Sequence, residues 1–163
     1  MKHFISIAAL SAASAAVFAG DVTGTVTLKG TAPAEKPIAP LMADVNCGKA
    51  AKGTVTTRHY VVGAASGLGN VFVYVKDGLN SFVFPIPSQP VVLDQDKCRY
   101  SPRVLGVRVG QPLQIRNSDP LLHNVRSNAV INQAFNKSTP VEGMTFDEFI
   151  AHIEGAGLFA DGD

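Results

Sequence analysis

Residues 110–125 read Gly-Gln-Pro-Leu-Gln-Ile-Arg-Asn-Ser-Asp-Pro-Leu-Leu-His-Asn-Val, and this stretch decides the predicted fold. Two short strands are predicted in it, at Pro112–Asn117 and at His123–Ser127, with a short loop between them. Gly110 and Gln111 form a tight link to a preceding strand, which is predicted over residues 104–109. The stretch therefore predicts consecutive short strands separated by turns.

The earlier part of the chain has the same organisation. Residues 70–76, Asn-Val-Phe-Val-Tyr-Val-Lys, have apolar side chains on both faces, which is typical of a central strand. Residues 21–29 alternate valine and leucine with threonine, as a half-buried strand does. Further strands are predicted over residues 58–62 and 90–94, and the proline-rich residues 33–40 are predicted to be an extended loop. Many short strands separated by glycine, proline and asparagine predict an all-β sandwich or barrel.

The tail has a different pattern. Thr145 followed by Glu148 matches a capping box, the usual start of a helix. The apolar residues after the cap fall at helical spacing, and Gly155 can end the element. These apolar residues are Phe146, Phe149, Ile150 and Ile153. Local rules therefore predict a short C-terminal helix over residues 146–154, with its apolar face packed on the sandwich.

The start of the chain predicts export. A short basic segment precedes an apolar run from Phe4 to Phe18. A run of about 15 residues suits a signal-peptide core and is short for a membrane span, which needs roughly 20. We expect cleavage after Ala19, so that residues 1–19 are a signal peptide and residues 20–163 a single domain, periplasmic or secreted. An uncleaved N-terminal anchor is the alternative.

Charge and composition exclude several function classes. Signal cleavage removes Lys2 and leaves the mature chain with equal numbers of basic and acidic residues. A neutral chain has no general electrostatic attraction for nucleic acid or anionic membranes, and no membrane span is predicted after cleavage. No serine–histidine–acid or paired-carboxylate arrangement stands out, and the histidines are scattered. The chain is therefore not predicted to be an enzyme.

The two cysteines, Cys47 and Cys98, both lie in the predicted mature chain. In an exported protein, two remaining cysteines most often pair with each other. A Cys47–Cys98 disulfide is therefore predicted, while metal ligation and free thiols remain as alternatives.

The pattern of a glycine turn, a strand that ends in Asn117, a short loop and then His-Asn-Val resembles the cupredoxin (plastocyanin-like) family. Further stretches resemble a periplasmic subgroup of this family, namely residues 68–75, 94–102 and 135–136, so that the resemblance covers roughly residues 20–146. It implies a Greek-key β-sandwich and copper-dependent electron transfer with a redox or other periplasmic protein partner. It also implies that His123 is a copper ligand and that Asn117 and Asn124 brace the loop around it.

The sequence departs from the family where the copper site is completed. A type-1 copper centre takes two histidines, a cysteine thiolate and a weak axial ligand that is often methionine. No cysteine follows Cys98, no methionine follows Met144, and His152 is the only histidine after His123. A truncated or frame-shifted product and a true variant of the family both explain this departure. The predicted function is an exported cupredoxin-like protein with an incomplete copper site. The alternative is a copper-free binding or interaction module on the same scaffold.

Overall fold

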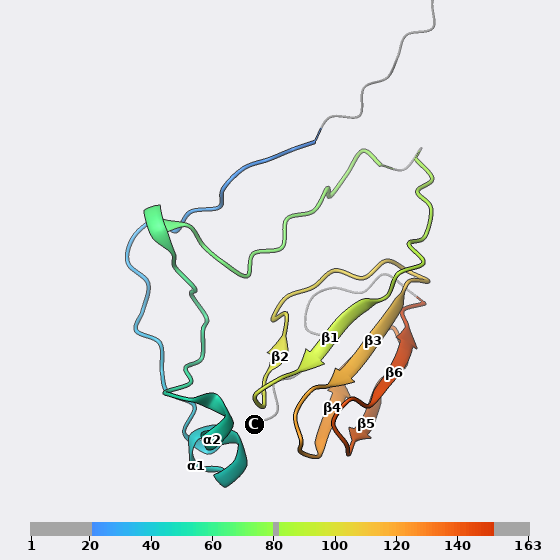
Figure 1. The fold of residues 1–163 in the computed structure, drawn as a ribbon. Helices are drawn as coiled ribbons and strands as arrows, with labels where there is room; N and C mark the ends of the chain where they lie inside the picture. The colour runs from blue at the N-terminus through green and yellow to red at the C-terminus, as the bar shows by residue number, and fades with distance from the viewer. Residues whose placement is uncertain (1–20, 80–81, 152–163) are drawn as a thin grey trace, which may run out of the picture.

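The computed structural model describes residues 21–79 and 82–151, and its regular structure is mostly β (Figure 1). The strands are β1 (Val91–Gln95), β2 (Tyr100–Ser101), β3 (Pro112–Asn117), β4 (His123–Ser127), β5 (Phe135–Thr139) and β6 (Thr145–Phe149). They form one four-stranded and one two-stranded sheet, and the described part of the chain contains no closed barrel. The prediction of a mostly β fold with strands near 90–94, 112–117 and 123–127 is confirmed.

The larger sheet is mixed, with the strand order β2-β1-β3-β6. β1 and β3 run parallel, in a register that places Gln95 beside Asn117, whereas β2 and β6 are antiparallel to their neighbours. β4 and β5 pair antiparallel in the smaller sheet, with His123 opposite Thr139. Because β1 and β3 are parallel, the loops that follow them leave the sheet at the same edge.

The hydrophobic core lies between the two sheets. Leu113 and Ile115 of β3 and Leu93 of β1 are buried together with Val125 of β4. In β3 these buried residues alternate with the outward side chains of Gln114 and Arg116, which is the period of two expected of a strand with one buried face. The side chains of the last inward positions, such as Asn117, are polar, and they lie at the edge where β1 and β3 end.

The predicted helix over residues 146–154 is wrong in its described part. Residues 145–149 form strand β6, which pairs with β3 over its whole length. Phe146 packs on the core and Ile150 is buried, but Phe149 is exposed, as alternation along a strand requires. Backbone pairing with a central strand outweighs a local capping signal, because it satisfies every second backbone group of β6. Residues 152–154 lie outside the described part of the chain.

Four other predicted strands are also wrong, those over residues 21–29, 58–62, 70–76 and 104–109. These segments run as extended or irregular backbone outside the sheets, with only isolated bridges such as Thr27 to Gly67 and Val62 to Leu68. Alternating side chains define a face that can be buried, but a strand also needs a neighbouring backbone. Among the described residues none pairs with 70–76, and its side chains are exposed.

Short helices follow the proline-rich segment, and the first of them overlaps the end of the loop predicted over residues 33–40. α1 (Ala39–Ala43) has a proline in its first turn, where no backbone N–H is required. α2 (Val45–Ala51) begins after Asp44, whose side chain accepts hydrogen bonds from the backbone N–H groups of Asn46 and Cys47. A single 3₁₀ turn, η1, covers Ala64–Ser66. α2 carries Cys47 and is therefore tied by a disulfide to the sheet region.

The sequence predicts a signal peptide and, after its cleavage, no membrane-spanning segment. The predicted signal peptide, residues 1–19, lies outside the described residues. Within 21–79 and 82–151, none of the helices has the length and apolar character that crossing a bilayer requires.

Candidate functional site

The candidate site lies at the sheet edge where the parallel strands β1 and β3 end (Figure 1). The loop after β1, residues 96–99, carries Cys98. The loop after β3, residues 118–122, carries Asp119 and leads into His123 at the start of β4. The parallel pairing therefore brings together three side chains from two loops and a strand.

Asn117 organises the second of these loops. Its side chain is fully buried, and its Nδ2 donates hydrogen bonds to the backbone carbonyls of Leu121 and Thr139, each at 2.7 Å. Its Oδ1 accepts from the backbone N–H of Asp119 at 2.9 Å. This amide thus closes the turn between β3 and β4 and fixes the position of Asp119.

The Asp119 carboxylate is held by two consecutive backbone N–H groups. The N–H of Lys97 donates to its Oδ1 at 2.7 Å and the N–H of Cys98 donates to its Oδ2 at 2.8 Å. Lys97 and Cys98 both have left-handed backbone, with φ of 54° and 56°. This conformation points successive N–H groups toward one anion. The loop after β1 therefore binds the carboxylate of the loop after β3.

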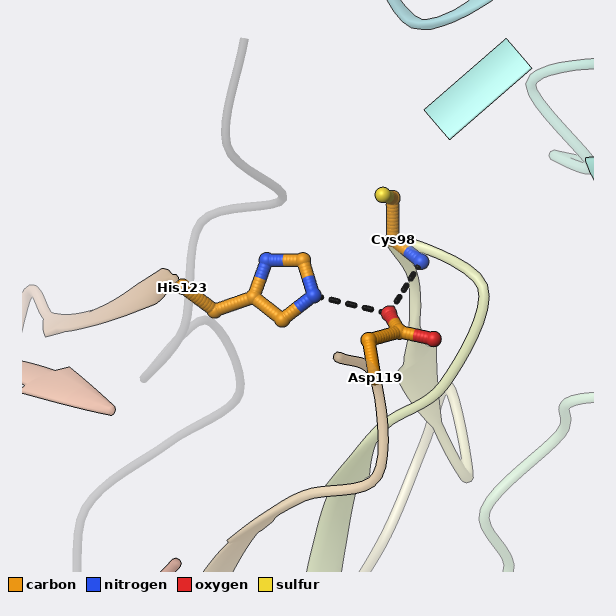
Figure 2. Close-up of side chains that lie close together, drawn as sticks. All are labelled: Cys98, Asp119 and His123. Carbon is orange, nitrogen blue, oxygen red and sulfur yellow. Dashed lines mark hydrogen bonds and ion pairs between the residues drawn. The ribbon is translucent and has the colours of Figure 1, made fainter. Parts of the chain in front are cut away.

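His123 completes the arrangement (Figure 2). Its Nε2 lies 2.7 Å from Oδ2 of Asp119, and its side chain is only 15% exposed. A carboxylate can only accept hydrogen bonds, so Nε2 carries a proton, and in the neutral imidazole Nδ1 keeps its lone pair. No described residue hydrogen bonds to Nδ1. The imidazole is thus held in one tautomer and one orientation, with an electron pair available for a ligand.

The environment of Asp119 keeps it ionised. Burial of the carboxylate raises its pKa, but hydrogen bonds from the N–H of Cys98, the ring of His123 and the N–H of Lys97 outweigh this effect. The pKa of Asp119 therefore lies below its ordinary value. The Asp119 side chain is only 6% exposed, so these hydrogen bonds hold a nearly buried negative charge at the end of the sheet.

This lowered pKa predicts a pH dependence of stability. A carboxyl whose folded-state pKa lies below its unfolded value contributes stability that is present above the unfolded pKa, about 4, and is lost as the pH falls through the folded pKa. We expect Asp119→Asn to cost about 1–3 kcal/mol of unfolding free energy at pH 7, and progressively less as the pH falls below about 4. Urea unfolding of both proteins between pH 3 and pH 7 measures the difference. If the unfolding free energies of the wild type and of Asp119→Asn change with pH in parallel, Asp119 does not have the lowered pKa described above.

A second layer of buried polar groups supports the site. Thr139 Oγ1 donates to Oε1 of Gln95 at 2.7 Å and also contacts the backbone carbonyl of His123 at 3.2 Å. Nε2 of Gln95 donates to the carbonyl of Asn124 at 3.3 Å. Gln95 and Thr139 are buried, and their hydrogen bonds link β1 to β5, β5 to β4 and β1 to β4, which restricts how the two sheets can move relative to each other.

The disulfide borders the site. Cys47 and Cys98 are bonded, with their Cα atoms 5.6 Å apart, within the range of about 7 Å that a disulfide allows. The Cys98 sulfur, an Asp119 oxygen and a ring nitrogen of His123 all lie within 4.8 Å of one another. Three potential metal-ligating groups thus converge, one of them already used in the disulfide.

The other residues singled out in the sequence fall in different places. Asn124 is exposed and hydrogen bonds to Asn136 and Ser138, so its side chain links β4 to β5. His59, the other histidine among the described residues, is not part of the metal-ligating group found there. His152 lies outside the described residues.

Sequence reasoning missed Asp119. Its signal was present as an acidic residue two positions after the buried Asn117 and four positions before His123. Asparagine followed by such a residue is typical of a side-chain-closed turn, which places the acid on the histidine side of the loop.

Comparisons with known proteins give no relative for this chain: no family model, no curated protein and no solved structure matches it.

Proposed function

We propose that this chain is an exported cupredoxin-like protein that binds Cu(II) through His123 and does not form a type-1 electron-transfer centre. The observation that carries the proposal is the 2.7 Å contact between Nε2 of His123 and Oδ2 of Asp119. A carboxylate that orients the second nitrogen of a histidine is a common feature of metal-binding imidazoles. The disulfide, typical of exported proteins, supports a periplasmic or secreted location.

The available ligands do not fit a blue-copper centre. Such a centre needs two imidazoles and a thiolate. In the described part of the chain, both cysteines are bonded to each other, so neither can supply a thiolate. The group of possible ligands around His123 contains no second histidine among the described residues. We therefore propose weak, pale Cu(II) binding by one imidazole, assisted by solvent ligands, on a scaffold of the Greek-key type that the resemblance implies.

Copper titration of the oxidised protein tests this proposal. We expect Cu(II) to bind without an intense visible band, because no thiolate is available to give a sulfur-to-copper transition. Electron paramagnetic resonance should show nitrogen coordination that disappears in His123→Ala. His59→Ala is the matched control and should retain the nitrogen signal. An intense blue band, or a nitrogen signal unchanged in His123→Ala, would refute the proposed site.

A second candidate function is a copper-free interaction module that binds a periplasmic protein. Its support is the extended segment around Val73 and Tyr74, whose side chains are 74% and 70% exposed. An unpaired extended backbone with apolar side chains can accept a strand from another protein. Failure of copper to bind to His123 in the titration would favour this candidate.

A further inference from the structure

We infer that reduction of the Cys47–Cys98 disulfide creates a zinc site made by Cys98, Asp119 and His123. In the oxidised protein the Cys98 sulfur already lies within 4.8 Å of both an Asp119 oxygen and a His123 nitrogen. A divalent ion at the centre of this triangle would take one sulfur, one oxygen and one nitrogen ligand. Figure 2 shows the three side chains around this point.

Two of the three ligands are preset by the fold. Asp119 is fixed by the N–H groups of Lys97 and Cys98 and by the turn that Asn117 closes. His123 is fixed by its contact with Asp119 and by its place in β4, opposite Thr139. A metal ion would replace the proton between Nε2 of His123 and the carboxylate, so that the imidazole proton moves to Nδ1.

The disulfide controls the third ligand. A dithiol reductant transfers two electrons and two protons to the sulfur pair, is itself oxidised to a disulfide, and leaves thiols at Cys47 and Cys98. Binding of the metal then displaces the proton of the Cys98 thiol to solvent. While the disulfide is intact, the Cys98 sulfur carries no charge and is a poor ligand.

Zn²⁺ is the ion that this set of donors favours. Zinc is commonly held by mixtures of cysteine, histidine and aspartate, and three protein ligands leave the fourth tetrahedral position for water. The thiolate also disfavours Mg²⁺ and Ca²⁺, which prefer oxygen ligands. The site differs from the Cu(II) site proposed above, because that one uses Nδ1 of His123 in the oxidised protein and needs no thiol.

Metal binding would also be coupled to the helical segment. Cys47 lies in α2, whose covalent attachment to the sheet region is this disulfide. Formation of the zinc site therefore requires that α2 loses that attachment. The same sulfur atom thus serves either to hold α2 or to bind the metal.

Two single-residue variants of the full chain separate these roles. Both Cys47→Ser and Cys98→Ser remove the same disulfide, so both lose the same chain constraint, but only Cys47→Ser leaves a thiol beside His123 and Asp119. Co²⁺ serves as a spectroscopic substitute for Zn²⁺, because a bound thiolate gives it an intense near-ultraviolet band. Isothermal titration with Zn²⁺ measures the affinity of each variant.

We expect Cys47→Ser to give the thiolate–cobalt band and to bind Zn²⁺ at least tenfold more tightly than Cys98→Ser or the oxidised wild type. Adding His123→Ala or Asp119→Ala to Cys47→Ser should weaken binding at least tenfold. If the variants fold poorly, the thiolate–cobalt band and the Zn²⁺ affinity can be measured instead on the wild type reduced under native conditions. Equal Zn²⁺ affinity in Cys47→Ser and Cys98→Ser, or no thiolate band in reduced wild type, would overturn the inference.

These outcomes are independent of the copper proposal. A protein that fails to bind Cu(II) when oxidised, but shows the thiolate–cobalt band when reduced, would refute the proposed function and support the zinc site. The reverse result would refute the zinc site alone.

Discussion

Replacing Cys47 and Cys98 together by alanine is expected to lower the free energy of unfolding by about 4 kcal/mol. The disulfide closes a loop with a sequence separation of 51 residues, and a constraint of that length removes this much entropy from the unfolded chain in the chain-entropy model. Chemical denaturation of the oxidised wild type and the double variant measures the difference.

The same measurement in a strong reductant is the control for this prediction. Reduced wild type and the double variant lack the same cross-link, so their unfolding free energies should agree to within about 1 kcal/mol. A difference that persists in the reductant would show that the cysteines stabilise the fold by packing and not by the bond between them.

Asn117→Ala is expected to destabilise the protein by about 3 kcal/mol or more. The substitution leaves the buried carbonyl of Thr139, the partly buried carbonyl of Leu121 and the buried N–H of Asp119 without their side-chain partner, and each unsatisfied buried group costs about 1–3 kcal/mol unless water replaces it. Urea unfolding at neutral pH gives the value.

Asn124→Ala is the matched control, because it removes the same side chain from an exposed position on β4. Its hydrogen bonds to Asn136 and Ser138 are open to water, so we expect a loss within about 1 kcal/mol. Similar losses for the two substitutions would mean that the turn before His123 does not depend on Asn117.

The sequence predicts the strands best where alternation and turn residues agree. β1, β3 and β4 carry apolar inward residues bounded by proline, glycine or asparagine, and all three form near their predicted bounds. β6 is predicted as a helix because its inward residues Phe146 and Ile150 are four positions apart, which fits both a period of two and a helical spacing over so short a segment. Only pairing with β3, which no local rule contains, distinguishes the two.

Residues 70–76 show the opposite failure. Their pattern is the strongest strand signal in the sequence, yet no described segment pairs with them. A β-strand forms only where its backbone hydrogen bonds to a neighbouring segment, so alternating side chains in one segment are not sufficient.

The site could be predicted only in part for a similar reason. His123 and Asn117 stand out because they flank a recognisable loop, and the two cysteines because no others exist. The role of Asp119 depends on the left-handed backbone at Lys97 and Cys98, and on the parallel pairing that brings their loop beside it. Neither lysine nor cysteine favours that conformation, so the local sequence gives no sign of it.

The position of β3 between β1 and β6 has a consequence for biogenesis. β1 precedes β3 in the chain, whereas β6 follows it by more than twenty residues. A polypeptide that emerges from the ribosome with its N-terminus first therefore presents β1 and β3 before the strand that covers the second edge of β3. During that interval an apolar strand with free backbone groups faces the solvent, and it is open to capture by chaperones or by other nascent chains.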